Sequence, residues 1–510
     1  MGDSLLMAVD LGTSFIKVGV YNEESECIAE AVEAVKDYRP SPNVFIQKGD
    51  ELFASVIACL KKTTGELGDR AKDVEAMSFT GQMSGFMGVS RDWEDITTWS
   101  CSLDARYIPY AERQMSVLKR AFLETAGTNF PAMAPKFEWY KTEFPDENKK
   151  IAKYLMISGY VIGKLGKLPV DDAVIDRSYT AWTGLSDIRN DSWSDEICDA
   201  IKLDKKFLPR IVNSNYICGK LDTEMAREVG LKSGIPLVSG AGDKVAGCLG
   251  AAIVTPGEMV FEAGSYGEIS CCVEEYRPDL EESRLDVLSA AIPKYFYATH
   301  FVAGSGITLD WFVNNFVRKD GEDLGRAFAR IDEKSSLLSP GCDGVMAIGL
   351  LGGSSMPLDG AIRGLWIGHN WSHRVEHFYR ALLESFTYDF ALAMKSIDRL
   401  YPEYDLSAVN MIGGGAKSPL WMQMFADVTG KTFRSLNRKD VSMWGAAILA
   451  GNAIGLFKDM KEVAKKHVSP VSEYKPDAGL AGKYAKYMNL YREKVVELRP
   501  LYEQIQNVSK

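Results

Sequence analysis

The sequence predicts an α/β protein of two domains, residues 1–245 and 246–510, and three observations support this class. A chain of 510 residues exceeds what a single hydrophobic core usually holds. Residues 7–14 recur in outline at 259–266, so the chain is built twice. Between and after these stretches, helical patterns alternate with short apolar runs that are typical of strands. We therefore expect two similar halves, each containing a sheet and helices.

In the first half, residues 5–36 alternate between apolar and polar positions in three short runs, which predicts an antiparallel meander. A helix is expected at 49–62 and a strand at 74–80, because the apolar spacing changes from helical to continuous. Helical patterns and apolar runs then alternate as far as 236–239, and the half ends near Gly240.

The second half opens with its own meander at 257–273 and offers further strands at 345–351 and 409–412. The stretch 376–400 predicts a long helix whose apolar stripe faces a core, because large apolar residues recur at helical spacing. A last amphipathic helix is expected near 480–506.

Composition limits the classes of protein that this chain can be. An apolar fraction of 46% with 25% charged residues is typical of a globular protein with buried cores. The net charge of −10 and the absence of a basic face argue against nucleic acid and against anionic membranes as partners. No signal peptide or spanning segment is found, and an odd number of cysteines, nine, without a C-x-x-C pair favours free thiols. We therefore expect a cytoplasmic protein.

The repeated stretches each combine a strand, an acid and a glycine turn with a hydroxyl beside it. Gly12 is followed by Thr13 and Ser14, and Gly264 is followed by Ser265. Backbone N–H groups of such turns, together with the hydroxyls, can donate hydrogen bonds to phosphate oxygens. The alternative is that both glycines only close ordinary hairpins. Because the arrangement occurs twice and each time beside an acid, we favour two turns that grip one polyphosphate.

Two acids stand where they could carry chemistry. Asp243 follows Gly242 at the start of an expected helix, between the two turns in sequence, and could accept the proton of an attacking hydroxyl. The alternative reading is a simple helix cap. Asp10 precedes the first turn and could hold Mg²⁺ through water, the alternative being a turn-forming aspartate.

A third glycine-rich stretch, residues 413–418, follows the strand at 409–412. It lacks the G-x-x-x-x-G-K-[ST] spacing, so it is not a Walker motif, and no G-x-G-x-x-G supports a dinucleotide fold. Three consecutive glycines still allow a flat base or a sugar to approach the backbone closely.

Taken together, these motifs resemble the FGGY carbohydrate kinases, whose fold belongs with actin, hexokinase and the Hsp70 ATPase domain. The matches occur in the order of the family over nearly the whole chain: 10–14, 176–181 with Trp193 and 208–209, 242–247, 360–365, 413–421 and 426–430. The resemblance implies two duplicated ribonuclease H-like domains around a central cleft. It also implies transfer of the γ-phosphoryl group of ATP to a hydroxyl of a sugar or polyol.

The resemblance also assigns roles by position. Asp243 would be the general base, and Asp10 would hold Mg²⁺ through water. The residues expected to contact the nucleotide and its phosphates are Gly12, Thr13, Ser14, Lys17, Gly264, Ser265, Gly414, Gly415, Ala416 and Ser418.

The acceptor side resembles the xylulokinase-like branch, with two departures. Residues 81–85 match a Gly-Gln-Met-His-Gly stretch in which Ser84 stands for the histidine, and Asp104 with Arg106 matches an Asp-x-Arg pair in which Ser102 stands for an upstream tryptophan. The predicted acceptor is a ketopentose such as xylulose, with ribulose, glycerol, erythritol, gluconate and fuculose as alternatives. The residues expected to bind it are Gln82, Met83, Ser84, Asp104, Arg106 and Asp243.

Structural alternatives remain open for the acceptor residues, because Gln82 could be an amide at the edge of the core and Asp104 with Arg106 a surface pair. A non-catalytic ATP-driven switch on the same fold is a second hypothesis. A metal-dependent hydrolase has little support, since His373 and His377 are interpreted as surface residues. A homodimer is left open.

Overall fold

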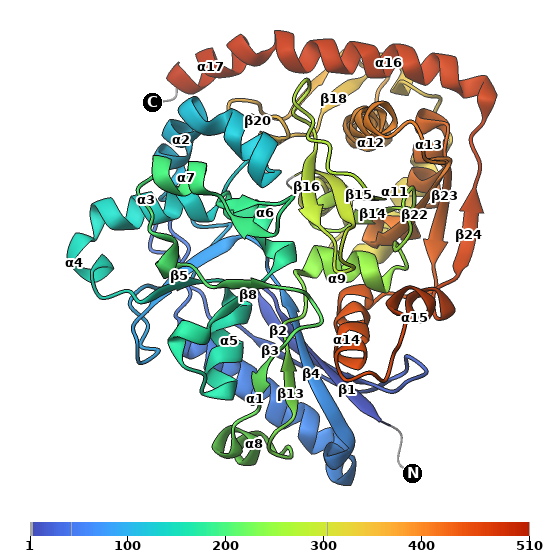
Figure 1. The fold of residues 1–510 in the computed structure, drawn as a ribbon. Coiled ribbons are helices and arrows are strands. Elements are labelled where there is room, and N and C mark those ends of the chain that lie inside the picture. The colour runs from blue at the N-terminus through green and yellow to red at the C-terminus, as the bar shows by residue number, and fades with distance from the viewer. Residues whose placement is uncertain (1–3, 42, 303, 509–510) are drawn as a thin grey trace.

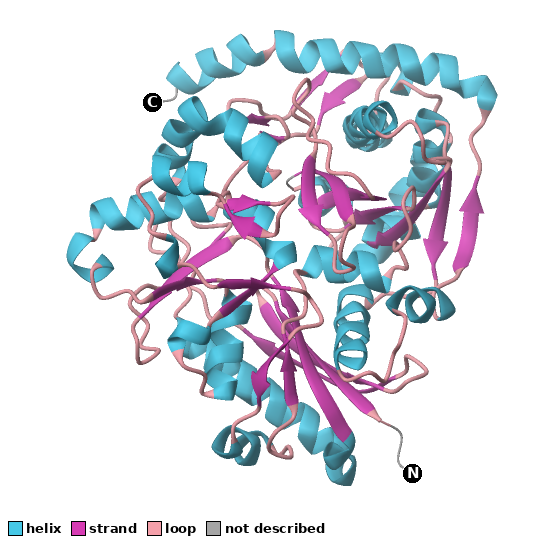
Figure 2. Cartoon of the chain, in the orientation of Figure 1, coloured by secondary structure: helices cyan, strands magenta, loops and turns pink. Residues whose placement is uncertain are grey.

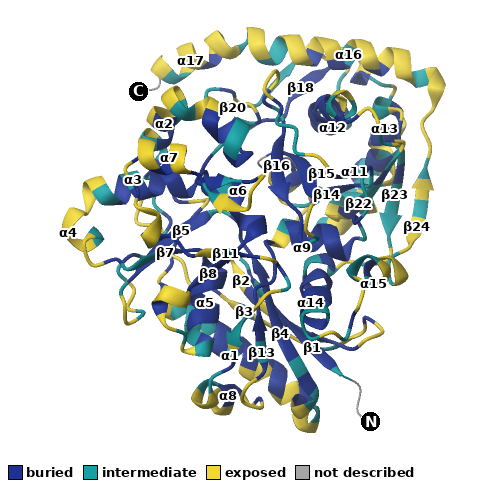
Figure 3. Ribbon diagram, in the orientation of Figure 1, coloured by how far each residue is buried: buried dark blue, intermediate teal, exposed yellow. Residues whose placement is uncertain are grey.

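Two mixed β-sheets, each flanked by helices, form the centre of the protein in a computed structural model that describes residues 4–41, 43–302 and 304–508 (Figure 1). Strands lie at the centre of each half and most helices lie outside them (Figure 2). Strands of the sheets are largely buried, whereas the outermost helices are exposed along one side (Figure 3).

The first sheet has six strands in the order β12-β13-β4-β1-β2-β3. Central strand β1 (Leu5–Leu11) is apolar and buried on both faces, as expected for a strand covered on both sides. It pairs antiparallel with β2 and parallel with β4. The remaining strands are β2 (Phe15–Tyr21), β3 (Cys27–Ala34), β4 (Val74–Gly81), β12 (Ile217–Lys220) and β13 (Pro236–Val238).

The second sheet has seven strands in the order β16-β17-β15-β14-β22-β23-β24. Its central strand β14 pairs antiparallel with β15 and parallel with β22. The strands are β14 (Met259–Ala263), β15 (Gly267–Val273), β16 (Asp286–Ser289), β17 (Phe296–Val302), β22 (Ala408–Gly413), β23 (Thr432–Leu436) and β24 (Pro470–Tyr474).

The two sheets share one plan, which confirms that the chain is built twice. In both, three antiparallel strands are followed by two parallel strands and one antiparallel edge strand, so that β3-β2-β1-β4-β13-β12 corresponds to β17-β15-β14-β22-β23-β24. The second sheet adds β16. The edge strands differ in chain order, because β12 precedes β13 whereas β24 follows β23.

Helices cover the outer faces of the sheets. Helix α1 (Gly49–Leu67) packs on β2 and β3, and α12 (Val375–Leu400) packs beside β17 and against α13 (Pro419–Thr429). The chain ends in α16 (Ala478–Glu497) and α17 (Arg499–Val508), which run along the outside of the molecule (Figure 1). The other α-helices are α2 (Ile108–Ala121), α3 (Met133–Glu143), α4 (Pro145–Asn148), α5 (Ile157–Gly166), α6 (Thr180–Thr183), α7 (Asp195–Ala200), α8 (Thr223–Val229), α10 (Ser305–Phe312), α11 (Leu324–Ser336) and α15 (Met460–Lys466).

Two helices cross between the sheets, and each reaches the sheet of the other half. Helix α14 (Val441–Ala453) packs on β1, β2 and β4 of the first sheet, although it comes late in the chain. Helix α9 (Asp243–Gly250) directs Lys244 to the second sheet, where it pairs with two glutamates. The helices touch through glycines, because an added Cβ on Gly250 or on Gly445 would lie 1.9 Å from a carbonyl oxygen of the other helix.

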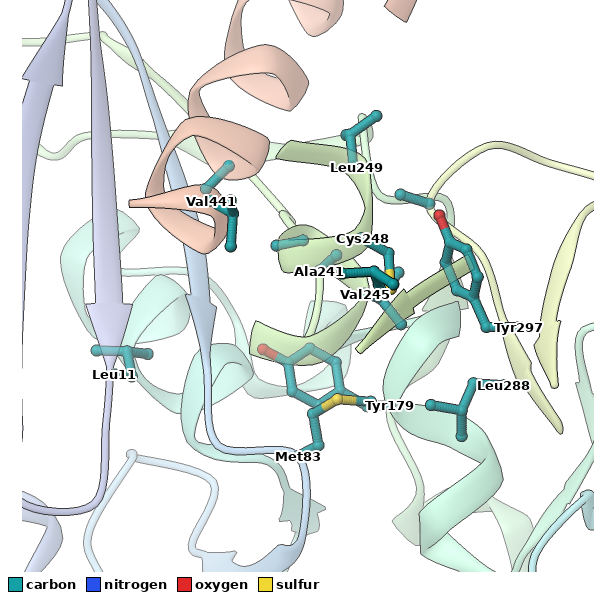
Figure 4. Close-up of a cluster of buried hydrophobic side chains, with 14 of the residues drawn as sticks. Leu11, Met83, Tyr179, Ala241, Val245, Cys248, Leu249, Leu288, Tyr297 and Val441 are labelled. Carbon is teal, nitrogen blue, oxygen red and sulfur yellow. The ribbon is translucent and has the colours of Figure 1, made fainter. Parts of the chain in front are cut away.

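A buried cluster around α9 joins both halves (Figure 4). Val245 and Cys248 lie on the side of α9 toward Tyr297 of β17, while Val441 of α14 and Leu11 of β1 lie on another side. Helix α9, which begins at Asp243, therefore packs against apolar side chains from both sheets.

Several expected elements differ in length from the structure. The helix predicted at 49–62 continues to Leu67, because its last turn still buries Thr63 and Thr64. The strand predicted at 345–351 is only β18 (Met346–Ile348), which pairs with β21 (Leu365–Ile367) outside the main sheets. The helix predicted near 480–506 is divided at Leu498 into α16 and α17.

The sequence also missed the third strand of the second meander, because β17 returns to β15 only after β16 and a long connection. His377 is buried, which makes the surface interpretation of this residue wrong: its Nδ1 accepts a hydrogen bond from the Arg374 N–H (3.1 Å) at the start of α12. Within the part of the chain that the structure describes, no helix is long and apolar enough to cross a membrane.

Candidate active site

The first glycine turn joins β1 to β2 at one end of the first sheet. An added Cβ on Gly12 would lie 2.7 Å from the carbonyl oxygen of Phe15, so the turn is too tight for a side chain at this position. Ser14 and Lys17, which follow, are exposed. The turn therefore presents backbone and polar side chains to solvent.

Three carboxylates from different elements lie within electrostatic range of one another. Asp10 lies on β1, between Lys17 of β2 and Thr80 of β4. Burial raises the pKa of Asp10 to about 6; Lys17 opposes this shift and Glu262, on the second sheet, adds to it. Asp243 is the first residue of α9. The first and second sheets thus contribute acids to one site.

Asp243 has the most perturbed carboxyl group of the three. Its side chain retains contact with solvent, but protein surrounds it so closely that burial is the main reason why its pKa rises to about 7. The negative charge of Asp10 contributes next, Lys244 opposes it, and Glu262 adds a smaller increase. A carboxyl group with a pKa near neutrality is suited to accept a proton and to release it again.

Lys244 holds the carboxylates of the second sheet in place. Its Nζ lies 2.6 Å from Glu262 and 3.2 Å from Glu268, and its side chain is only 12% exposed. Burial lowers the pKa of Lys244, but the two glutamates outweigh burial and raise it overall. In return, Lys244 lowers the pKa of Glu262 and keeps this carboxyl group ionised beside Asp10 and Asp243.

The second glycine turn joins β14 to β15 and repeats the position of the first. Gly264 packs against Gly306 at the start of α10, where an added Cβ on Gly306 would lie 2.1 Å from the Gly264 carbonyl oxygen. The carbonyl oxygen of Ser265 accepts a hydrogen bond from the Ile307 N–H (3.2 Å), and Ser265 itself is exposed.

The three-glycine stretch lies directly beside this second turn. Gly413 pairs with Ala263 in the sheet and has a φ of +84°, which favours glycine. An added Cβ on Gly415 would lie 2.5 Å from Ala263 Cβ, so the stretch lies flat against the end of β14. Ser418 then caps α13, accepting a hydrogen bond from the Trp421 N–H (3.1 Å). Gly414 is exposed and Ala416 is half-buried.

The loop at 81–85 lies next to the first glycine turn. The Gln82 N–H donates to the carbonyl oxygen of Leu11 (3.1 Å), and Gln82 Oε1 accepts a hydrogen bond from the Thr13 hydroxyl (3.3 Å). The Thr13 carbonyl oxygen in turn accepts a hydrogen bond from Gln47 Nε2 (2.7 Å). Gln82 is 7% exposed and its Nε2 has no hydrogen-bond partner among the described residues, which leaves a buried donor for a ligand or water.

Met83 and Ser84 continue this loop toward α9. An added Cβ on Gly242 would lie 2.4 Å from Met83 Cγ, so Met83 packs directly against the residue that precedes Asp243. Figure 4 shows Met83 beside Tyr179 in the buried cluster. Ser84 is half-buried.

Asp104 is buried and its partner Arg106 is half-buried, so the alternative of a surface pair is wrong for the carboxylate. Asp104 is fully buried and accepts hydrogen bonds from Arg106 Nε (2.9 Å) and Nη2 (2.8 Å) and from the Ser100 hydroxyl (2.7 Å). Burial alone would raise the pKa of Asp104, but these hydrogen bonds outweigh it and lower the pKa. The Arg106 guanidinium lies over the Trp139 ring, and Lys136 Nζ donates to the Ser100 carbonyl oxygen (2.6 Å).

The structure therefore brings most of the predicted residues together in two groups. One group consists of the two glycine turns, the three-glycine stretch, Asp10 and Asp243. The loop at 81–85 joins this group through Leu11 and Thr13. The second group is the Asp104–Arg106 pair, which is connected to the loop through the pairing of Gly85 with Cys101.

Sequence reasoning missed Glu262, Lys244 and Gln47 as members of the site. Glu262 carried a signal, because it stands in the second repeat where Asp10 stands in the first. Lys244 and Gln47 carried none, since their partners lie 18 or more residues away in the chain.

Comparison with known proteins identifies the family of the chain. The model of the FGGY family of carbohydrate kinases, N-terminal domain, matches residues 5–250, and the model of its C-terminal domain matches residues 269–454. The xylulose kinase of Bacillus subtilis is 26% identical over 500 residues, with 96% of each chain covered. The gluconokinase of Bacillus licheniformis is 25% identical over 522 residues, covering 99% of this chain and 98% of the relative.

Solved structures show the same fold. The gluconate kinase from Lactobacillus acidophilus superposes with a TM-score of 0.89 at 20% identity, covering 99% of this chain and all of the other. The glycerol kinase of Plasmodium falciparum, solved with ADP, gives a TM-score of 0.85 at 19% identity, covering 97% of this chain and 98% of the other.

The fold and the two family models define a phosphotransferase of the actin and hexokinase type, with a sugar hydroxyl as the class of acceptor. The chain belongs to the FGGY family of carbohydrate kinases. Kinases of this class use ATP as the phosphate donor, generally together with Mg²⁺.

The residues present fit a nucleotide that brings its own cation. Within the described ranges, no group of three or more His, Cys, Asp or Glu side chains is placed to hold a metal ion alone. Carboxylate oxygens near phosphates are nevertheless what Mg²⁺ prefers, usually together with several waters. Asp10 and Glu262 supply such oxygens, each on the strand that leads into one of the two glycine turns.

Proposed function

We propose that this protein transfers the γ-phosphoryl group of ATP to a hydroxyl of a ketopentose or a related sugar or polyol, with Asp243 as the general base. The observation that carries the proposal is the position of Asp243. Its carboxyl group stands at the start of α9, within electrostatic range of an acid from each sheet, and its pKa is raised to about 7. Asp243 can therefore take the proton of the attacking hydroxyl at neutral pH.

The glycine turns would hold the phosphates. The backbone N–H groups of these turns and the hydroxyls of Ser14 and Ser265 are donors that suit phosphate oxygens, and the Thr13 hydroxyl would join them by turning away from Gln82 Oε1. Lys17 adds a positive charge beside Asp10. Because the transition state of phosphoryl transfer is loose, positioning and charge neutralisation are the main tasks of the protein.

The neighbouring stretch would bind the adenosine. Gly414 leaves an exposed backbone beside the second turn, Gly415 packs against Ala263 and Trp421, and Ala416 and Ser418 follow them in the chain. Mg²⁺ would be held by Asp10 through water and would neutralise phosphate charge.

The acceptor would lie between the loop at 81–85 and Asp243. The unpaired Gln82 Nε2 is a donor for a sugar hydroxyl, and Ser84 replaces an imidazole with a shorter group, which enlarges the pocket. Met83 would contribute its apolar side chain. Asp104 and Arg106 are already paired with each other, so only the remaining N–H groups of Arg106 would reach a ligand.

Two further expectations remain proposals. We place the division between the domains at 245/246, a point that falls inside α9. We also propose a cytoplasmic location, which is supported by the nine cysteines, all of which are free thiols.

A coupled assay of ADP release, run with a panel of ketopentoses, polyols and sugar acids, tests the proposal. Acceptor-dependent ADP release with one member of the panel is the expected result, and a thermal-shift screen with a nonhydrolysable ATP analogue narrows the panel beforehand. ATP turnover that no acceptor changes would instead favour the ATP-driven switch.

A further inference from the structure

The segment 176–178 matches a family motif but has no role in the site described so far. It follows β8 (Val174–Asp176), and both Asp176 and Ser178 are buried. The Asp176 carboxylate accepts hydrogen bonds from the Ser178 N–H (2.9 Å) and hydroxyl and from the Ser214 hydroxyl (2.8 Å). Asp176 is therefore saturated by donors from two segments of the chain.

The Ser178 hydroxyl makes a second contact that reaches the active site. Its oxygen accepts a hydrogen bond from the Gly242 N–H (2.8 Å), and this contact is buried. A serine hydroxyl can donate or accept, but an ionised carboxylate can only accept. The Ser178 hydroxyl therefore donates its proton to the Asp176 carboxylate. Its oxygen lone pairs remain available to accept the hydrogen bond from the Gly242 N–H.

The other N–H groups of the same turn are held by backbone. The Gly240 N–H donates to the Ser214 carbonyl oxygen (2.9 Å), and the Ala241 N–H donates to the Phe79 carbonyl oxygen (3.1 Å). The N–H groups of residues 240 and 241 thus donate to backbone oxygens, and the N–H group of residue 242 donates to the Ser178 side chain. Without it, the Gly242 N–H would be buried and unpaired, which is unfavourable and would favour rotation of the peptide toward another acceptor.

We infer that Ser178, oriented by Asp176, is a positioning residue for phosphoryl transfer: its hydroxyl fixes the peptide of Gly242 and thereby the direction in which Asp243 points. This inference rests on the proposed function of Asp243 as the base. Met83 of the loop at 81–85 packs directly against Gly242. Rotation of the Gly242 peptide would therefore displace both Asp243 and this loop.

The same segment is tied to the second sheet on its other side. Arg177 Nη1 donates to the carbonyl oxygen of Ala290 (3.1 Å), in the connection from β16 to β17, and Arg177 Nε pairs with Asp191 (3.0 Å). The segment 176–178 therefore connects the turn before Asp243 with the β16–β17 connection of the second sheet.

The test is Ser178→Ala, with Ser186→Ala as the matched control. Ser186 is equally buried in the same region, and its hydroxyl donates to the Thr180 carbonyl oxygen (3.0 Å) without touching residues 239–243. For Ser178→Ala we expect kcat to fall about tenfold to a hundredfold, as small displacements of a reacting group do. The KM values for ATP and for the acceptor should change by less than about twofold, because the binding groups are not altered.

The outcomes separate the inference from its alternatives. A fall in kcat that is absent in Ser186→Ala, with both variants melting at similar temperatures, supports the positioning role. Equal kcat values in the two variants would overturn it, and so would a fall that both share. If Ser178→Ala does not accumulate as folded protein, the same comparison is made with Asp176→Asn, which keeps the shape of the side chain but offers Ser178 or Ser214 an N–H in place of an oxygen.

The proposed function is tested separately in the same assay by Asp243→Asn. If Asp243→Asn retains full activity, the proposed base is wrong, whatever Ser178→Ala shows. If Asp243→Asn is inactive and Ser178→Ala matches the wild type, only the positioning role is wrong.

Discussion

Replacing Asp243 by asparagine should remove activity and stabilise the protein at the same time. In the proposed reaction the carboxyl group is the proton acceptor, and a general base contributes about 10²–10⁴-fold to a rate. The same group is held in a place where its charged form is disfavoured, because burial and Asp10 raise its pKa from an ordinary 3.8 to about 7. The asparagine side chain has the same shape but is uncharged, so burial and the charge of Asp10 do not destabilise it.

The size and the pH range of the stabilisation follow from this shift. For a group sealed from solvent, the difference between 3.8 and about 7 would correspond to about 4 kcal/mol; because the Asp243 side chain is exposed, we expect roughly 1–2 kcal/mol. The folded protein binds the proton more tightly than the unfolded chain does. The wild type therefore has no penalty below about pH 4, and the penalty grows as the pH rises and is complete above about pH 7.

Differential scanning calorimetry or fluorimetry on ligand-free protein measures the effect. At pH 8, the Asp243→Asn variant should melt roughly 1–2 °C above the wild type, and the difference should shrink as the pH falls toward 5. A variant that melts below the wild type at pH 8, or a difference that does not depend on pH, would refute the electrostatic account. Loss of activity alone would not support the electrostatic account.

Three further substitutions test the surrounding structure. In Gly413→Ala, the φ of +84° and a carbonyl oxygen of β14 at 2.7 Å from the new Cβ should cost about 1–3 kcal/mol and raise the KM for ATP, as thermal melts and initial rates would show. In Gly445→Ala, the new Cβ would lie 1.9 Å from a carbonyl oxygen of α9, so the melting temperature should fall sharply; Gly482→Ala in α16, with nothing within 4 Å, is its control and should be neutral or stabilising by up to about 1 kcal/mol. Lys244→Met leaves two carboxylates without their cation and should destabilise by about 3–5 kcal/mol at pH 8 in urea unfolding, but by less at pH 5, where the carboxylates can bind protons; equal losses at the two pH values would contradict this.

The repeats could be predicted from the sequence because their signals are local. The meander at 5–36, the turn after β14 and the strand before the three glycines each depend on residues close in the chain, and all three occur in the structure. The same locality placed Asp243 at the start of a helix.

The remaining parts depend on contacts between distant segments. Lys244 could be assigned only once Glu262 and Glu268 were placed beside it, and the burial of Asp104 depends on Arg106 and Ser100 folding around one carboxylate. The crossing of α14 onto the first sheet has no local signal either, because an apolar helix packs equally well on any apolar surface.

That crossing has a consequence for how the molecule can be divided. Tyr21 of β2 donates a hydrogen bond to Asp440 (2.7 Å) and packs against Trp444 of α14, so an isolated first half would expose the strand surface that α14 shields. A fragment ending at 245 would also cut α9 after its third residue. Each half thus contributes a helix that packs against the other half. We expect neither fragment to stay in solution when it is expressed alone, and both to be recovered when they are expressed together.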